Sequence, residues 1–514
     1  MGVVLDMSKQ LDLLIINPGA STKIYQSLAA HYTTIEPPSW GLLIAEAMRS
    51  KGFSVQILDC DALRISDEFA ALVIKHSNPK LSLVVSYGQN PNSSTTSMTG
   101  AISLAEEVKL VDPSLKIAVM GSHVQALPSE TLDLGHFDFI ITGEGIKTIP
   151  NLLLSDLDKD LPKIRGIGFR RDGQNIINEY EDIVGQNEMD SLMPGYAFDL
   201  LDYHKKPFDI YRAPPWHALY NEDLRSPYAA IYTSLGCFFQ CGFCLINIIN
   251  RTKAGNHISA ADSNIMRTWS TDWVLRQIDY LVSKGVRTIK FSDELFIAQP
   301  KHYEPILKGI IERGYNDLLI WSYSRVSTVK EKYLELCKNA GMKYLALGIE
   351  SGSQTIRQEI DKGSFRDVNI RDVVKKVHDH DINIIGNYIY GLKGDNHETM
   401  QNTLNLAMEL NTAAYNSYPC HALPGSPLYL EMKKKGVKLP SNFSEWSFLS
   451  YDCQPLPTDY LSAAEVLKFR DESWHIYHNR PEYLSMIEGK FGLTARTNIE
   501  EMAKIKLKRK LLGD

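Results

Sequence analysis

Three cysteines lie within eight residues, in the stretch TSLGCFFQCGFCLIN at residues 233–247. Cys237, Cys241 and Cys244 are separated by three and then by two residues. A structural zinc site would need four ligands, and no second cysteine pair or histidine pair follows at a suitable spacing. A redox CxxC pair would leave Cys237 unexplained. A 4Fe-4S cluster fits better, because three thiolates leave one iron without a protein ligand and free to bind a substrate.

The other cysteines do not indicate a disulfide framework. The chain has seven cysteines, and Cys60, Cys337, Cys420 and Cys453 are scattered singly. We interpret each of these four as a small buried apolar residue. A cluster of cysteines without a disulfide pattern is typical of a reducing compartment and of a metal-binding or catalytic role.

The length and charge of the chain limit its class. With 514 residues we expect two or three domains. The net charge of −6 argues against nucleic acid as a partner. No long apolar run and no secretory signal is seen, so we expect no transmembrane segment and a cytoplasmic protein. The basic run at residues 504–512 predicts a solvated helix face or, alternatively, a contact with a membrane surface or a lipid-linked substrate.

Two parts of the chain alternate apolar runs with amphipathic stretches, and this pattern predicts the strands and helices that position the cysteines. In residues 1–155, short apolar runs alternate with amphipathic stretches, which predicts a doubly wound α/β domain with parallel strands. Such a sheet binds ligands beyond the carboxyl ends of its strands. Residues 156–221 lose this period and are interpreted as a linker. Residues 222–436 repeat the alternation six times and predict a partial (β/α)6 barrel, and residues 437–514 predict a helical C-terminal domain.

The cysteine motif, together with the segments after it, resembles the radical S-adenosylmethionine (SAM) enzymes. Behind the triad come FSDELF at residues 291–296, WSYSRV at 321–326, LGIESGS at 347–353 and GNYIYGLKGD at 386–395. These match, in order, the family's later strand motifs. The resemblance implies that the open iron of the cluster chelates SAM and that a 5′-deoxyadenosyl radical is formed. The SAM contacts that it implies are Phe243, Asp293, Glu294, Ser324, Arg325, Glu350, Ser351, Tyr390 and Gly391.

The first domain resembles the cobalamin-binding domain of cobalamin-dependent radical SAM enzymes. A methylthiotransferase domain would carry three more cysteines, whereas residues 1–155 contain only Cys60. The DxHxxG motif is absent, so no histidine of that motif should ligate cobalt. The cobalamin contacts that the resemblance implies are Asn17, Tyr87, Gln89, Asn90, Gly121, Ser122, His123, Gly143, Glu144 and Gly145. Nucleotide binding, or a cobalamin fold that has lost its ligand, is the alternative for this domain.

Three functions remain open from the sequence. The resemblance favours methylation of an unactivated carbon through methylcobalamin and the adenosyl radical. The same cofactors could instead carry out a rearrangement, cyclisation or epimerisation. A cluster used only for electron transfer or sensing is the third, non-catalytic alternative. The expected partners are a small-molecule substrate, such as a sugar nucleotide or a lipid-linked intermediate, and a reductant such as flavodoxin or ferredoxin.

Overall fold

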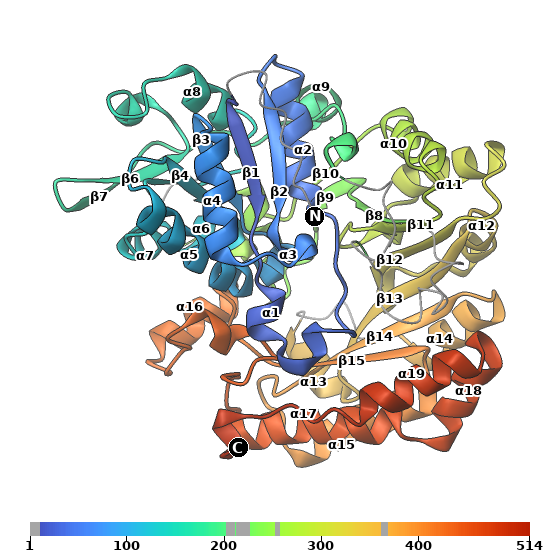
Figure 1. The fold of residues 1–514 in the computed structure, drawn as a ribbon. Coiled ribbons are helices and arrows are strands. Elements are labelled where there is room, and N and C mark those ends of the chain that lie inside the picture. The colour runs from blue at the N-terminus through green and yellow to red at the C-terminus, as the bar shows by residue number, and fades with distance from the viewer. Residues whose placement is uncertain (1–10, 202–210, 212–226, 252–257, 361–367) are drawn as a thin grey trace.

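The computed structural model describes residues 11–201, 211, 227–251, 258–360 and 368–514. Figure 1 shows an N-terminal α/β domain beside a curled sheet with outer helices, and C-terminal helices that run along the lower edge of that sheet. The fold class expected from the sequence is confirmed. The exact domain bounds stay predictions.

The N-terminal domain is built on a mostly parallel sheet. Its strands are ordered β2-β1-β3-β4-β5-β6-β7, and the chain order reverses between β1 and β3. In a sheet of this kind, the crevice at that reversal is where ligands bind. The parallel strands are β1 (Leu13–Asn17), β2 (Val55–Asp59), β3 (Leu81–Val85), β4 (Ile117–Met120) and β5 (Phe139–Ile141).

Helices cover both faces of this sheet. Alternate strand residues such as Leu14 and Ile16 pack against α4 and α5, whereas Leu13 and Ile15 pack against α2, because successive side chains of a strand point to opposite faces. The helices are α1 (Ser21–Ile24), α2 (Ser39–Arg49), α3 (Cys60–Leu63), α4 (Asp67–Ser77), α5 (Ser94–Val111), α6 (Ser122–Ala126), α7 (Pro128–Asp133), α8 (Thr148–Leu154) and α9 (Met189–Leu192).

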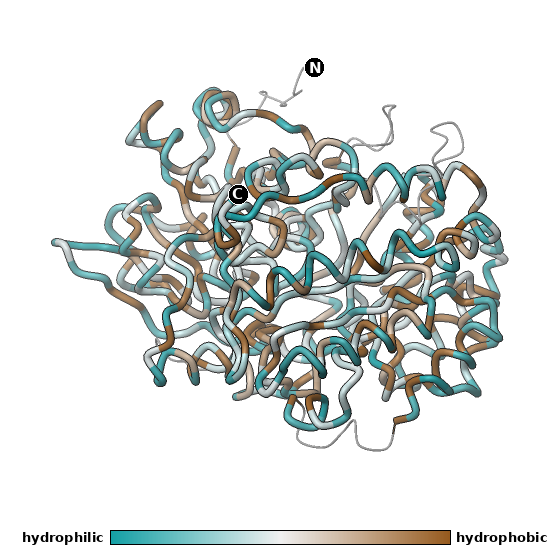
Figure 2. Tube along the Cα trace, turned by 90° about the horizontal axis from the view of Figure 1, so that it is seen from below, coloured by the Kyte–Doolittle hydropathy of each residue, from teal (hydrophilic) through white to brown (hydrophobic). Residues whose placement is uncertain are grey.

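Part of the expected linker is instead an extension of the sheet. Strands β6 (Ile167–Arg171) and β7 (Gln174–Ile177) add to β5 as an antiparallel hairpin. Its two-residue turn, Asp172-Gly173, has positive φ at both positions, and the Asp-Gly pair is a strong hairpin signal that the interpretation as a linker overlooked. The hairpin protrudes at the left of Figures 1 and 2, where its tip is hydrophilic. Residues 202–210 and 212–226 of the expected linker lie outside the described residues.

The second domain is a partial barrel of six parallel strands. Their order is β15-β14-β13-β12-β11-β8, so each strand from β11 to β15 is followed in space by the next. The strands are β8 (Tyr228–Ile231), β11 (Thr288–Phe291), β12 (Leu319–Arg325), β13 (Met342–Glu350), β14 (Asn383–Tyr390) and β15 (Ala414–Pro419). A short antiparallel pair, β9 (Ser234–Gly236) and β10 (Met266–Thr268), leads into and out of the cysteine loop.

Amphipathic helices alternate with the barrel strands. In α10, Trp273, Val274, Ile278 and Leu281 are buried on one face, as the helical spacing predicts. The helices are α10 (Thr271–Ser283), α11 (Pro300–Glu312), α12 (Leu334–Asn339), α13 (Gln354–Ile360), α14 (Ile370–Asp379), α15 (His397–Leu410) and α16 (Pro427–Lys434).

The C-terminal domain is helical, as expected. Helices α17 (Ala463–His478), α18 (Pro481–Phe491) and α19 (Leu493–Ala503) follow in close succession. A capping box between Ser462 and Glu465 begins α17, which packs against β15. The basic run predicted as a helix face instead has no regular secondary structure at residues 505–509 and ends in a short 3-10 helix, Lys510–Leu512. Ile505 and Leu507 are half-buried, whereas Lys504, Lys506 and Lys508 are exposed.

Two buried ion pairs join the N-terminal domain to the barrel. Lys290 of β11 is fully buried and lies 2.8 Å from the Glu36 carboxylate. Arg267 of β10 pairs with Glu144, and both side chains are 3% exposed. Because a buried charge that loses its partner is costly, these pairs fix how the two domains dock.

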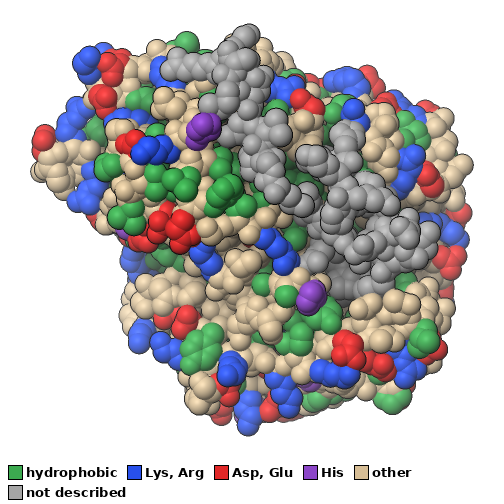
Figure 3. Space-filling model, in the orientation of Figure 1, with side chains coloured by type: hydrophobic (Ala, Val, Ile, Leu, Met, Phe, Trp, Pro, Cys, Tyr) green, Lys and Arg blue, Asp and Glu red, His purple; other side chains and the backbone are tan. Residues whose placement is uncertain are grey.

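The surface has no single dominant charge on the face shown in Figure 3, where acidic and basic side chains are interspersed. None of the helices in the described ranges combines the length and the apolar character needed to cross a bilayer.

Candidate active site

The three clustered cysteines line one cavity of about 380 Å³ at the carboxyl ends of the barrel strands. We call it the cluster cavity. Cys237, Cys241 and Cys244 follow β9 and are each half-buried. Side chains from β12, β13 and β14, from the segment after β15, and from residues 90–93 of the N-terminal domain complete its wall.

The cysteine geometry suits a cluster. Burial raises the pKa of the Cys237 and Cys244 thiols to about 12, so both stay protonated until iron displaces the proton. Within the described ranges, no three His, Cys, Asp or Glu side chains converge on a point that could hold a single metal ion. A 4Fe-4S cluster has no such requirement, because each thiolate binds its own iron. Three thiols around one cavity therefore fit the cluster better than a lone ion.

Five of the predicted SAM contacts reach the cluster cavity. Phe243 comes from the cysteine loop, Glu294 follows β11, Ser324 and Arg325 end β12, and Glu350 ends β13. The Arg325 guanidinium lies 4.1 Å above the ring of Phe239, which holds a cation beside the cysteines. Glu350 has a positive φ of 65°, an unusual backbone for a non-glycine residue that is found most often at functional sites.

The two acidic residues after β11 have different environments. Asp293 is fully buried and accepts hydrogen bonds from the Thr233 amide at 2.6 Å and from the hydroxyls of Thr233 and Ser234. It ties the ends of β8 and β11 together and does not line the cavity. The Glu294 carboxylate does line it, and its Oε1 is buried without a hydrogen-bond partner among the described residues. Burial raises the pKa of Glu294 to about 8.

Glu294 and Arg325 give the cavity the groups that SAM needs. The amino acid end of SAM carries an ammonium and a carboxylate, and a buried carboxylate with an oxygen that lacks a hydrogen-bond partner is the natural acceptor for the ammonium. Arg325 supplies a fixed cation for the carboxylate. The residues present therefore fit SAM, and the contact expected of Asp293 stays a prediction, since this side chain does not line the cavity.

Three further predicted SAM contacts do not line the cluster cavity and stay predictions. Ser351 is fully buried and accepts from the Ser353 amide, Tyr390 is paired through its hydroxyl with Tyr415 at 2.6 Å, and the Gly391 amide donates to Asp395. Ser351 directly follows Glu350 and Tyr390 directly follows Ile389, so each is one position out of step with a cavity-lining residue, and alternate residues of a strand face opposite sides. On β13 the cavity-facing residues are Ala346, Gly348 and Glu350, and on β14 they are Asn387 and Ile389. His421, after β15, also lines the cavity.

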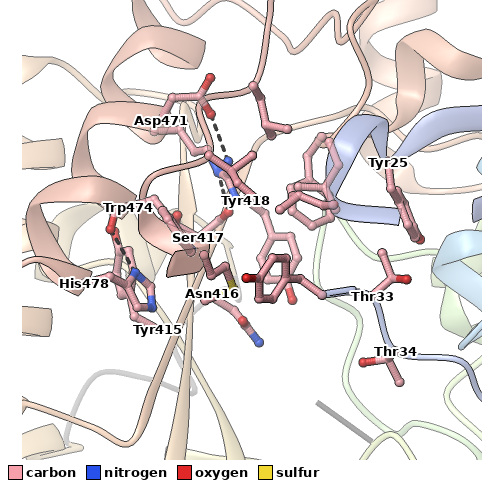
Figure 4. Close-up of a pocket in the computed structure, with 18 of the residues that line it drawn as sticks. Tyr25, Thr33, Thr34, Tyr415, Asn416, Ser417, Tyr418, Asp471, Trp474 and His478 are labelled. Carbon is pink, nitrogen blue, oxygen red and sulfur yellow. Dashed lines mark hydrogen bonds and ion pairs between the residues drawn. The ribbon is translucent and has the colours of Figure 1, made fainter. Parts of the chain in front are cut away.

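A second and larger cavity lies between all three domains. Its volume is about 910 Å³, and we call it the interdomain cavity. Figure 4 shows Tyr25, Thr33 and Thr34 of the N-terminal domain on one side, and residues 415–418 of β15 with Asp471, Trp474 and His478 of α17 on the other. The two cavities adjoin, since they share Tyr25, Asn90, Ser93, Tyr323, Ala346, Tyr418 and Phe448.

Four of the predicted cobalamin contacts lie at the strand-end crevice. Gln89 and Asn90 line the interdomain cavity. Asn17 donates to Asp59 at 2.7 Å and faces small cavities beside the loop after β3. Tyr87 is buried, stacks on Trp40 at 4.5 Å between ring centroids, and borders only the smallest of these cavities.

The other six predicted cobalamin contacts have structural surroundings. His123 is buried between Thr95 and Phe443, and burial lowers its pKa to about 4. Glu144 is held by Arg267 and by the Val184 amide. Gly121, Ser122, Gly143 and Gly145 are buried beside them and line neither large cavity. These six cobalamin contacts stay predictions, and in the structure the same residues also contribute to the packing of the domain and its docking surface.

The interdomain cavity suits a corrin. From the N-terminal domain it presents the neutral amides and hydroxyls of Thr33, Thr34, Gln89, Asn90 and Ser93, which suit the carboxamide groups around a corrin ring. No histidine of that domain lines it within the described residues. The sequence analysis did not identify residues 25–36 as part of this cavity wall. The connection from β1 to α2 is about 20 residues long, and connections of that length are commonly functional.

The family comparisons agree with both halves of the site. Residues 231–407 match the model of the radical SAM superfamily, and residues 25–153 match the model of the B12-binding domain. The chain therefore belongs to the cobalamin-dependent radical SAM enzymes, whose cofactors are a 4Fe-4S cluster, SAM and cobalamin.

Relatives and a solved structure extend over nearly the whole chain. The uncharacterized methyltransferase PH0819 of Pyrococcus horikoshii is 23% identical, over 93% of this chain and 94% of its own. The anaerobic magnesium-protoporphyrin IX monomethyl ester cyclase of Cereibacter sphaeroides is 22% identical, over 84% of this chain and 66% of its own. The structure of TsrM, a radical SAM methyltransferase from Kitasatospora setae with cobalamin and a 4Fe-4S cluster bound, is 14% identical, covers 96% of this chain and 99% of its own, and has a TM-score of 0.64. That likeness shows a shared fold.

Proposed function

We propose that the protein is a carbon methyltransferase that acts on an unactivated carbon of a small molecule. The observation that carries this proposal is that the cluster cavity and the interdomain cavity adjoin and share part of their walls. A substrate at that junction would be within reach of both cofactors. An unactivated carbon has no lone pair with which to attack SAM, so both are needed.

The chain's own residues bind and orient these groups. Cys237, Cys241 and Cys244 would hold the cluster, while Glu294 and Arg325 would hold the two ends of the SAM amino acid. Gln89, Asn90 and Thr34 would hold the corrin periphery. When bound, the cofactors supply the radical and the methyl group. Phe239 and Phe243 line the cluster cavity and would exclude water from it.

For the substrate we propose a sugar nucleotide or a lipid-linked intermediate. Lys468 and Lys506 on the wall of the interdomain cavity would suit phosphate groups, and Phe448 and Trp474 would pack against a ring or chain. We also propose flavodoxin or ferredoxin as the reductant and the cytoplasm as the location. The free state of all seven cysteines supports a reducing compartment.

Cyclisation or another rearrangement is the second candidate, and the similarity to the ester cyclase favours it. A rearrangement differs from methyl transfer because no methyl group of SAM appears in its product. Membership of an enzyme family argues against the third, non-catalytic alternative.

The test is to trace the methyl group. Reconstituted protein would be incubated anaerobically with reductant, an extract of small molecules and SAM that carries a deuterated methyl group, and products would be compared by mass spectrometry. We expect a cobalamin-dependent product that contains the label. Consumption of an extract component with no label in any product would contradict methyl transfer and favour rearrangement.

A further inference from the structure

A residue of the N-terminal domain contacts one of the cluster cysteines. Asn92 lies in the loop after β3 and lines the cluster cavity. Its side-chain Nδ2 lies 3.9 Å from Cys244 Sγ, and its Oδ1 accepts from the Leu245 amide at 3.3 Å. The second contact fixes the orientation of the amide group, because only the oxygen can accept from an N–H. The N–H₂ group therefore faces the sulfur.

The loop that carries Asn92 is itself held firmly. The Asn90 side chain accepts from the Asn92 amide at 3.0 Å, and the Ser93 amide donates to the Asn90 carbonyl at 2.9 Å. Pro91 between them is buried and fixes the backbone at the start of this short turn. The side chain of Asn92 is thus placed by the N-terminal domain before any cofactor arrives.

The segment after Cys244 also rests on this domain. Residues 246–250 pack against α6, and Arg251 donates to the Gln125 carbonyl. The buried Glu144–Arg267 pair lies close by, since Arg267 also donates to Asn250 at 3.1 Å. The position of Asn92 relative to Cys244 is therefore set by a charged, buried interface and not by a flexible contact.

The other end of the cysteine loop has a partner from the barrel itself. Asn247 accepts from the Cys237 amide at 2.9 Å and donates to the Phe239 carbonyl at 3.1 Å. Two asparagines thus support the loop, one from its own domain and one from the neighbouring domain. Of these two, Asn92 is the one that reaches a sulfur.

We propose that Asn92 helps to set the reduction potential of the cluster, so that the cobalamin-binding domain contributes directly to the electron-transfer step of its neighbour. A hydrogen bond to a cluster thiolate stabilises the reduced cluster more than the oxidised one, because the reduced form carries more negative charge. The bond therefore raises the potential and makes reduction easier. This inference rests on the cluster that the proposed function requires.

The test is a potentiometric titration of the full-length protein, followed by the electron paramagnetic resonance signal of the reduced cluster. The protein would be reconstituted with iron and sulfide, without SAM or cobalamin. In Asn92→Leu and Asn92→Ala we expect the ratio of reduced to oxidised cluster at a fixed potential to fall about tenfold, which corresponds to about 59 mV for one electron. Thr96→Ser, a change on the same cavity wall that keeps the hydroxyl donating to the Ser93 carbonyl, is expected to leave the ratio unchanged.

Iron content separates the outcomes. Asn92 variants that hold as much iron as wild type but titrate at the wild-type potential would overturn the inference. Variants that assemble no cluster would also overturn it, because one hydrogen bond is not a cluster ligand. A wild-type protein that assembles no cluster would contradict the proposed function itself.

Discussion

The cysteine loop and the crevice of the N-terminal domain both line cavities, but they are built in different ways. The loop brings three chemically distinctive side chains together within eight residues. The crevice gathers ordinary amides and hydroxyls from two separated loops, residues 25–36 and 89–93, and is closed by the barrel and α17. Local spacing therefore defines the first site, whereas domain docking defines the second.

The largest effect is expected at the cysteine loop. Cys241→Ala removes one of three ligands, so iron content should fall severely and 5′-deoxyadenosine formation should drop more than about 100-fold. Iron and sulfide analysis with a product assay would measure both. Cys420→Ala is the matched control, because Cys420 lines the same cavity but lies outside the motif. Equal loss of iron in both variants would contradict the assignment of Cys237, Cys241 and Cys244 as the cluster ligands.

On the N-terminal side, the expected effect is on stability. Glu144→Gln leaves Arg267 buried without its anionic partner and should lower the free energy of unfolding by about 3–5 kcal/mol. Denaturant titration measures this. Glu130→Gln removes only an exposed pair with Lys433 and should cost ~0–1 kcal/mol. A Glu144→Gln protein that has normal stability but fails to bind cobalamin would instead support the cobalamin contact that the sequence predicts for Glu144.

The two acidic residues after β11, Asp293 and Glu294, are expected to have different roles. Glu294 should affect SAM binding, and Asp293 should affect stability. Glu294→Gln should raise the dissociation constant of SAM about 10-fold to 100-fold, because a charged hydrogen bond to the ammonium is lost. Calorimetric titration of the reconstituted protein would measure it. Asp293→Asn should lower the melting temperature and leave the SAM affinity of the folded protein nearly unchanged. The opposite pattern would exchange the two roles.

The smallest effect expected is a pH dependence of the SAM-free protein. The pKa of Glu294 is raised by burial from 4.5 to about 8. A raised carboxyl pKa stabilises the fold below about pH 4.5, and this contribution is lost as pH rises through 8. Glu294→Gln should therefore gain on the order of 1 kcal/mol relative to wild type between pH 6 and 9. Melting curves across that range would test it, and parallel curves for the two proteins would contradict the shifted pKa.

Much of the fold and of the cluster loop could be predicted from sequence, because both depend on local periodicity and spacing. The six barrel strands and the five parallel strands of the first domain lie where apolar runs predicted them. The β6–β7 hairpin was missed although its Asp-Gly turn was visible. Among the predicted SAM contacts, Tyr390 does not line the cluster cavity whereas its neighbour Ile389 does, because alternate residues of a strand face opposite sides.

The cobalamin contacts were harder to predict for a different reason. Glu144 and His123 resemble ligand-binding residues in sequence, and only the packed structure reveals that Arg267 and Phe443 occupy their surroundings. Asn92 carries no local signal at all, because its significance comes from a cysteine 152 residues away. Contacts between domains are set by docking, which no short pattern encodes.

The most direct test of the central claim, that adjoining cavities let one chain use both cofactors, is an anaerobic turnover assay with and without cobalamin. The reconstituted protein would receive reductant and SAM, and S-adenosylhomocysteine and 5′-deoxyadenosine would be quantified. The account predicts both products in the cobalamin-loaded protein, and loss of S-adenosylhomocysteine alone when cobalamin is omitted. S-adenosylhomocysteine formed at the same rate without cobalamin, or not formed in either case, would contradict it.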